Sequence, residues 1–181
     1  MPSKDPLRDR LIRLFLPRGN DADKPRESYA VRSIVGAVRK ENQDSAAYVQ
    51  ARFRSRERDF NAGIVCDGLG GMARGQTASA LGVSAFVARL VRLSRGSLLD
   101  RAKAAIEEAN KEIFSVLRGA GGTTLVAVIV PRFGSTIVVH AGDSRAYCLD
   151  RHRELLQLTR DDTLAELLER GGLQKAPPDH S

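Results

Sequence analysis

The stretch FNAGIVCDGLGGMARG, residues 60–75, decides how the rest of this sequence is interpreted. Its first half, Phe60 to Cys66, is a short apolar run that is typical of a strand in a protein core. Asp67 ends the run, and an ionised carboxylate there is costly to desolvate unless a positive charge meets it. The glycines that follow allow a close main-chain approach, so the carbonyl oxygen of Gly68 can point into the same cavity. Carboxylate and carbonyl oxygens suit Mg²⁺ or Mn²⁺, and the stretch therefore indicates a cation site.

Residues 68–73 also fit the G-x-G-x-x-A pattern of dinucleotide-binding proteins. A lone match of this kind is weak, and the carboxylate of Asp67 would lie beside the pyrophosphate that such a loop binds. The sequence after the glycines also predicts two helices in a row, not a crossover between parallel strands. Dinucleotide binding is therefore the weaker interpretation.

The pattern on both sides of this stretch predicts an α+β fold. Ser97 and Asp100 form a capping pair at the start of the second of two amphipathic helices. Strands before the helix pair and strands after it favour antiparallel sheets covered by helices. The predicted strands cover residues 29–34, 46–49, 60–66, 123–130, 136–141, 145–149 and 155–158, and the predicted helices cover 76–93, 98–117 and 164–169.

The length of the chain predicts a single domain, and its composition is typical of a globular protein. The chain has 181 residues and a formal net charge of +7, spread along the sequence. Arg52, Arg54, Arg56 and Arg58 alternate with other residues, which predicts one solvated face of a strand. No set of aromatic residues accompanies them, so we expect no nucleic-acid partner.

Further expectations concern the cellular setting and the domain boundary. Cys66 and Cys148 each lie in an apolar run, which predicts two reduced core thiols. The sequence has neither an apolar stretch long enough to span a bilayer nor a signal peptide, so we expect a cytoplasmic protein without stable membrane insertion. Residues 1–27, with a short basic amphipathic helix near the start, are expected to be an appendage, and residues 28–181 the domain.

Two more carboxylates lie in turns or at strand ends. Asp143 lies in the turn Gly142-Asp143-Ser144-Arg145, and Asp44 ends the polar segment that starts at Arg39. Each residue alone is more often structural, because aspartate commonly bonds to the main chain of its own turn. Together with Asp67, we expect them to converge on one cation site.

The ordered motifs of this sequence resemble those of the metal-dependent protein phosphatases of type 2C, and most of all those of the bacterial branch. The resemblance covers about residues 28–181. Its motifs are Arg39 with Asn42-Gln43-Asp44, Asp67-Gly68-Leu69-Gly70-Gly71 with Gly75 and Ala78-Ser79, Gly122-Thr123-Thr124, Gly142-Asp143-Ser144-Arg145-Ala146-Tyr147 and Leu158-Thr159-Arg160-Asp161.

This resemblance implies a four-layer α-β-β-α sandwich with antiparallel sheets. It also implies hydrolysis of phosphoserine and phosphothreonine in proteins during signal transduction, with two or three Mn²⁺ or Mg²⁺ ions. The implied partners are phosphorylated protein substrates and a cognate Ser/Thr kinase.

The same resemblance implies a role for each site residue. Asp67 would bridge two metal ions, and Gly68 would add its carbonyl oxygen. Asp143 would bind a third, looser ion. Asp44 would orient a metal-bound water without binding the metal itself, and Arg39 would bind the substrate phosphate through its planar set of donors.

The sequence also departs from the family pattern. Gln43 replaces a common Glu, Leu69 occupies a position where animal enzymes have His, and Asp162-Thr163 replaces a common His-Ser pair. Family members continue into strands that supply two more metal-binding aspartates, so we expect a sandwich that is incomplete at the C-terminal end. We also expect little activity from residues 1–181 alone, and the alternative function is an inactive phosphatase-like interaction module.

Overall fold

A computed structural model describes residues 21–22, 29–37, 41–92 and 95–162. Its centre is an antiparallel sheet in the order β3-β4-β6-β7, and β5 pairs with the end of β4. The strands are β3 (Asp44–Ala51), β4 (Phe60–Leu69), β5 (Gly122–Thr123), β6 (Leu125–Pro131) and β7 (Ile137–Ala141).

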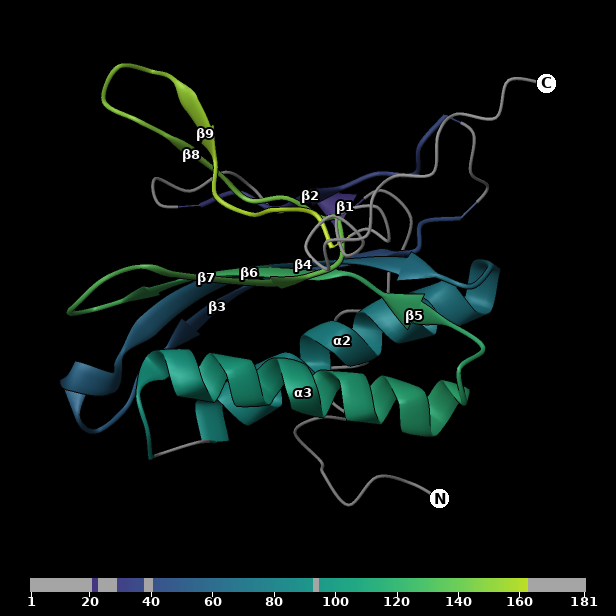
Figure 1. The fold of residues 1–181 in the computed structure, drawn as a ribbon, viewed down its shortest axis with the longest axis horizontal. Coiled ribbons are helices and arrows are strands. Elements are labelled where there is room, and N and C mark those ends of the chain that lie inside the picture. Colours follow the sequence, from purple (N-terminus) through teal and green to yellow (C-terminus); the bar gives the residue numbers. More distant parts are fainter. Residues whose placement is uncertain (1–20, 23–28, 38–40, 93–94, 163–181) are drawn as a thin grey trace, which may run out of the picture.

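Two helices cover one face of this sheet (Figure 1). They are α2 (Met72–Arg92) and α3 (Leu98–Leu117). The predicted capping pair is confirmed, because the Ser97 side chain accepts from the Asp100 N–H while the Asp100 carboxylate accepts from the Ser97 N–H. The second predicted helix therefore has the bounds that its sequence indicated.

The core lies between the helices and the sheet. Alternate residues of β4 are buried, among them Phe60, Ile64 and Cys66, because successive strand side chains point to opposite faces. Phe86 and Leu90 of α2 pack into the same cluster. The α+β class with antiparallel sheets is thus confirmed, and the intervening residues of β4, including Asp67, point away from the helices.

The other face of the sheet carries two small sheets. One pairs β1 (Asp21–Ala22) with β2 (Arg32–Ser33), and the other pairs β8 (Tyr147–Leu149) with β9 (Leu155–Gln157). Figure 1 shows the β8–β9 hairpin projecting from the side opposite the helices. Residues 21–22 belong to the predicted appendage, and in the structure they join this second side.

Several sequence expectations need correction. The strand that was expected to end at Cys66 continues to Leu69, and Asp67 is exposed. Cys148 is exposed as well, because it lies in the projecting two-stranded hairpin, whereas Cys66 is buried as predicted. The dinucleotide interpretation is wrong, because β4 pairs antiparallel with β3, β5 and β6, so the glycines follow no parallel strand.

The predicted arginine face is also wrong. β3 ends at Ala51, and residues 56–58 form a short 3-10 helix, η1 (Arg56–Arg58). The guanidinium of Arg52 donates to the main-chain oxygens of Ala51 and Phe60, which ties the start of the connection back to the strand pair. The alternating arginines therefore lie in the loop between β3 and β4, where their spacing predicted a strand.

The predicted helices near the start of the chain and at residues 164–169, together with Arg39, lie outside the described residues. Within the part that the structure describes, no helix combines the length and the apolar character needed to cross a membrane.

Substitution of Phe86 tests the core. Phe86 has 0% exposure, and Phe→Ala changes in protein cores cost about 3–5 kcal/mol, a large part of the stability of a small domain. We expect Phe86→Ala to lower the Tm strongly or to prevent folding. Phe114→Ala on α3 is the matched control, since Phe114 is 64% exposed, and its Tm should stay near that of the wild type. Equal losses in the two variants, measured by thermal unfolding, would contradict this assignment of the core.

Candidate active site

The register between β3 and β4 sets Asp44 directly opposite Asp67. Residues opposite each other in an antiparallel pair point to the same face of the sheet, with Cβ atoms about 4.5–5.5 Å apart. Both carboxylates therefore lie side by side on the face away from the helices, at the end of the sheet where β3 begins and β4 ends.

Asn42 fixes the chain just before Asp44. Its side chain is buried, and its Oδ1 accepts from the Asp44 N–H at 3.0 Å while its Nδ2 donates to Ser33 Oγ at 2.6 Å. The main-chain oxygen of Asn42 also accepts from Gln76 Nε2 of α2 at 3.1 Å. These bonds join β2, the start of β3 and α2 at the carboxylate pair.

Gly68 brings the end of β4 against the first turns of α2. A Cβ at position 68 would overlap the carbonyl oxygen of Gly75 and would lie 2.6 Å from the main-chain oxygen of Gln43. A Cβ at Gly75 would in turn lie 2.5 Å from Gln43 Oε1. Gly68 is therefore required by close approach of the main chain, whereas the atoms nearest to a Cβ at Gly75 belong to the Gln43 side chain, which is directed at α2.

A cleft of about 320 Å³ opens at this end of the sheet. Asp44, Asp67 and Gly68 line it together with residues of segments 34–36 and 41–43 and with Leu69. A wider hollow of about 560 Å³ lies farther along the sheet, but its described lining contains no acidic side chain. The cleft is therefore the candidate site.

The electrostatics of the pair favour a cation. Burial raises the pKa of Asp44, and the charge of Asp67 and a hydrogen bond between the two carboxyl groups raise it further. Two carboxylates held together repel each other when both are ionised, and a divalent cation between or beside them would remove that cost. The oxygen atoms of Asp67 and the Gly68 main chain fit Mn²⁺ or Mg²⁺ as ligands, and the Asp44 carboxylate beside them adds a second negative charge.

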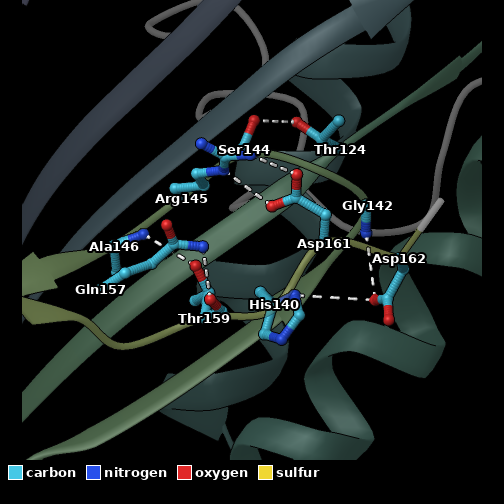
Figure 2. Close-up of polar contacts among 10 residues, drawn as sticks. All are labelled: Thr124, His140, Gly142, Ser144, Arg145, Ala146, Gln157, Thr159, Asp161 and Asp162. Atoms are coloured by element: carbon cyan, nitrogen blue, oxygen red, sulfur yellow. Dashed lines mark hydrogen bonds and ion pairs between the residues drawn. The ribbon is translucent and has the colours of Figure 1, made fainter. Parts of the chain in front are cut away.

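Asp143 lies in the turn after β7, and Thr124 connects that turn to Asp67. The Asp67 N–H donates to Thr124 Oγ1 at 3.0 Å, and the same hydroxyl lies 2.7 Å from Ser144 Oγ. The Thr124 N–H also donates to the main-chain oxygen of Asp67 at 2.9 Å. Figure 2 shows Thr124 and Ser144 at one edge of the polar cluster around the turn.

The structure thus brings Asp44, Asp67 and Gly68 into one cleft, which Asp143 does not line. Among the described residues, no three His, Cys, Asp or Glu side chains gather closely enough to hold a metal ion. Arg39 is outside the described residues. Sequence reasoning gave no role to Asn42 or Thr124, although both stand inside the quoted motifs, because their side chains bond to main-chain groups that only the fold brings near.

Searches among known proteins found relatives in bacteria. The chain is 38% identical over 148 residues to the serine/threonine protein phosphatase PstP of Mycobacterium tuberculosis, a match that covers 77% of this chain and 26% of that protein. It is 33% identical over 155 residues to the serine/threonine phosphatase stp of Listeria monocytogenes, covering 80% of this chain and 58% of that protein. No family model matches the chain.

Solved structures give the same result. The crystal structure of the Mycobacterium tuberculosis phosphatase PstP/Ppp has a TM-score of 0.60 and 35% identity, over 79% of this chain and 58% of that one. A structure of the catalytic domain of PstP in complex with two manganese ions has a TM-score of 0.59 and 34% identity, over 79% of this chain and 59% of that one. The chain therefore spans at most about three fifths of these relatives and solved chains.

Substitution of Gly68 tests the close approach at the cleft. Gly68→Ala should cost about 1–3 kcal/mol, since the new methyl group meets main-chain atoms that cannot move aside without shifting α2. Gly63→Ala is the matched control on the same strand, because nothing lies within 4 Å of a Cβ there. Chemical denaturation of the two variants measures the difference, and equal stabilities would show that β4 and α2 do not approach as described.

Removal of one charge of the carboxylate pair should stabilise the metal-free protein. Because the pKa of Asp44 is raised by folding, the folded state binds this proton more tightly, and its stability should fall as the pH rises from about 4 through the raised pKa. In EDTA at pH 7 we expect Asp44→Asn to raise the Tm by a few degrees.

The same experiment contains its own control. At a pH below 4 the wild-type carboxyl is protonated, so the difference between Asp44→Asn and the wild type should disappear. Addition of Mn²⁺ at pH 7 should stabilise the wild type more than the variant. A variant that is less stable than the wild type in EDTA at pH 7 would contradict mutual repulsion in this pair.

Proposed function

Because this chain is a homologue of the bacterial serine/threonine protein phosphatases of type 2C, we propose that the protein hydrolyses phosphoserine and phosphothreonine in other proteins with the help of Mn²⁺. The observation that carries the proposal is the carboxylate pair Asp44 and Asp67 in a cleft beside Gly68. Such a pair, opposite in register, with Asp44 half-buried and Asp67 exposed, has the charge that a divalent cation requires.

Asp67, Gly68 and Asp44 have different proposed roles in phosphate hydrolysis. Asp67 and the Gly68 carbonyl oxygen would hold metal ions, and Asp44 would accept a hydrogen bond from the water that attacks phosphorus. The new bond joins that water oxygen to phosphorus while the bond from phosphorus to the serine or threonine oxygen breaks. The proton that the attacking water loses balances the proton that the released serine or threonine oxygen gains. When bound, Mn²⁺ supplies Lewis acidity that offsets the phosphate charge.

The remaining site residues complete the proposal. Arg39 would bind the substrate phosphate, since a guanidinium offers two parallel donors to phosphate oxygens. Asp143 would bind an additional ion at the turn next to Ser144, which makes two or three ions in total. Mg²⁺ would serve in place of Mn²⁺, because both prefer oxygen ligands.

The cellular part of the proposal follows from the substrate class. The protein would reverse the action of a Ser/Thr kinase on phosphorylated proteins in the cytoplasm, as a step in signal transduction. It would neither bind nucleic acid nor insert stably into a membrane. Its phosphatase domain would begin near residue 28, after an appendage of about 27 residues.

Loss of the Asp67 carboxylate should abolish Mn²⁺-dependent phosphate release from a phosphothreonine peptide by the full-length protein. The physical reason is that Asn provides no negative charge to hold the cations. Asp150→Asn is the matched control, because the Asp150 carboxylate caps the β8–β9 turn through the N–H groups of His152 and Glu154. Full activity of Asp67→Asn would overturn the assignment, as would equal losses in the two variants.

Arg39 should act on substrate binding more than on the chemical step. We expect Arg39→Ala to raise the KM for the phosphopeptide with a smaller change in kcat, because one phosphate-binding group is lost while the carboxylates remain. Steady-state kinetics at saturating Mn²⁺ measures the split. A fall in kcat at unchanged KM would assign Arg39 a different role.

A further inference from the structure

The turn that carries Asp143 is restrained by hydrogen bonds and an ion pair from residues that have no role in the proposed reaction. Asp143 is exposed, and its carboxylate forms no hydrogen bond or ion pair with another of the residues that the structure describes. Gly142 before it has a φ of 97°, a left-handed conformation that favours glycine. A carboxylate on such a turn reaches one defined place only if neighbouring groups hold the turn.

Asp162 forms hydrogen bonds with both main-chain polar groups of Gly142. Its N–H donates to the main-chain oxygen of Gly142 at 3.0 Å, and its Oδ2 lies 3.4 Å from the Gly142 N–H as acceptor. The same Oδ2 lies 3.6 Å from Nδ1 of His140, the residue two positions before Gly142 on β7. Figure 2 shows the contacts from the Gly142 N–H and from His140 meeting at the Asp162 carboxylate.

The other side of the turn has its own supports. Asp161 accepts from Arg145 Nε at 2.8 Å and from Arg145 Nη2 at 2.6 Å, which is a bidentate ion pair. Ser144 contacts Thr124, which bonds to the main chain of Asp67. Two consecutive aspartates thus hold opposite sides of the turn, and the side nearest Gly142 depends on Asp162.

We propose that Asp162 is a positioning residue, which fixes the Gly142–Ser144 turn so that the Asp143 carboxylate is presented for metal binding. The inference rests on the proposed function through the metal role of Asp143. In Asp162→Ala the main-chain N–H of residue 162 still donates to Gly142, but the Gly142 N–H loses its carboxylate acceptor and His140 loses its contact. Gly142 is then less restrained, and glycine has more conformational freedom to regain than any other residue. The Arg145–Asp161 pair and the Ser144–Thr124 contact remain, so the domain should keep its fold.

The first test measures order in the turn without metal. Backbone ¹⁵N relaxation should show lower order parameters at residues 142–144 in Asp162→Ala than in the wild type. Asp162→Asn keeps an oxygen acceptor for the Gly142 N–H and should recover most of that order. Asp150→Ala, on the β8–β9 turn, is the matched control and should leave residues 142–144 unchanged. Unchanged order parameters in Asp162→Ala would overturn the proposal.

The second test is a double-mutant cycle on Mn²⁺ affinity, measured by the electron paramagnetic resonance signal of free Mn²⁺. We expect Asp162→Ala to weaken binding by roughly tenfold, at the low end of the range for residues that orient metal ligands. In an Asp143→Asn background the same change should have no further effect, since its action passes through Asp143. A purely structural role would weaken binding equally in both backgrounds, and that result overturns the inference.

The double-mutant cycle also distinguishes the positioning role of Asp162 from the metal-binding role of Asp143. If Asp143→Asn weakens Mn²⁺ binding and Asp162→Ala does not, the positioning role of Asp162 is wrong while the proposed metal site stands. If Asp143→Asn has no effect on Mn²⁺ binding, the metal role of Asp143 fails, and the inference fails with it.

Discussion

The antiparallel register of β3 and β4 is the constraint on which the candidate site depends. It places Asp44 opposite Asp67 on one face of the sheet and, by the same alternation, Ser45 opposite Cys66 on the face that packs against the helices. A shift by one residue would bury the carboxylates and expose the core. The packing of α2 and α3 therefore specifies the geometry of the candidate site as well as the stability of the domain.

The cleft beside Asp44 and Asp67 also depends on close packing of the main chain of β4 against the main chain of α2. Gly68 lets the end of β4 approach the start of α2 more closely than a side chain at this position would allow. The buried Asn42 then ties the start of β3 to β2 through its side-chain amide and to α2 through its main-chain oxygen. Burial and, after it, the charge of Asp67 raise the pKa of Asp44, and this packing maintains both effects because the strands cannot separate to relieve them.

The turn after β7 follows a different principle. Its geometry rests on polar contacts from residues that lie about 20 positions away in the sequence, Thr124 on one side and Asp162 on the other. Such contacts are weaker individually than core packing, and the turn is therefore the part of the site that single substitutions can loosen without unfolding the protein. This separation allows Asp143 to be studied apart from the Asp44–Asp67 pair.

The sequence by itself determined the α+β class, the helix from Leu98 to Leu117, and the identity of Asp44 and Asp67 as a candidate pair, because helical periodicity, capping and family motifs are local in the chain. It failed where distant contacts override local pattern: the alternating arginines after Ala51 form a loop, and Cys148 is exposed on a hairpin. Only the tertiary structure decided that Thr124 and Asp162 hold the Asp143 turn, since hydrogen-bond partners far apart in sequence carry no local signature.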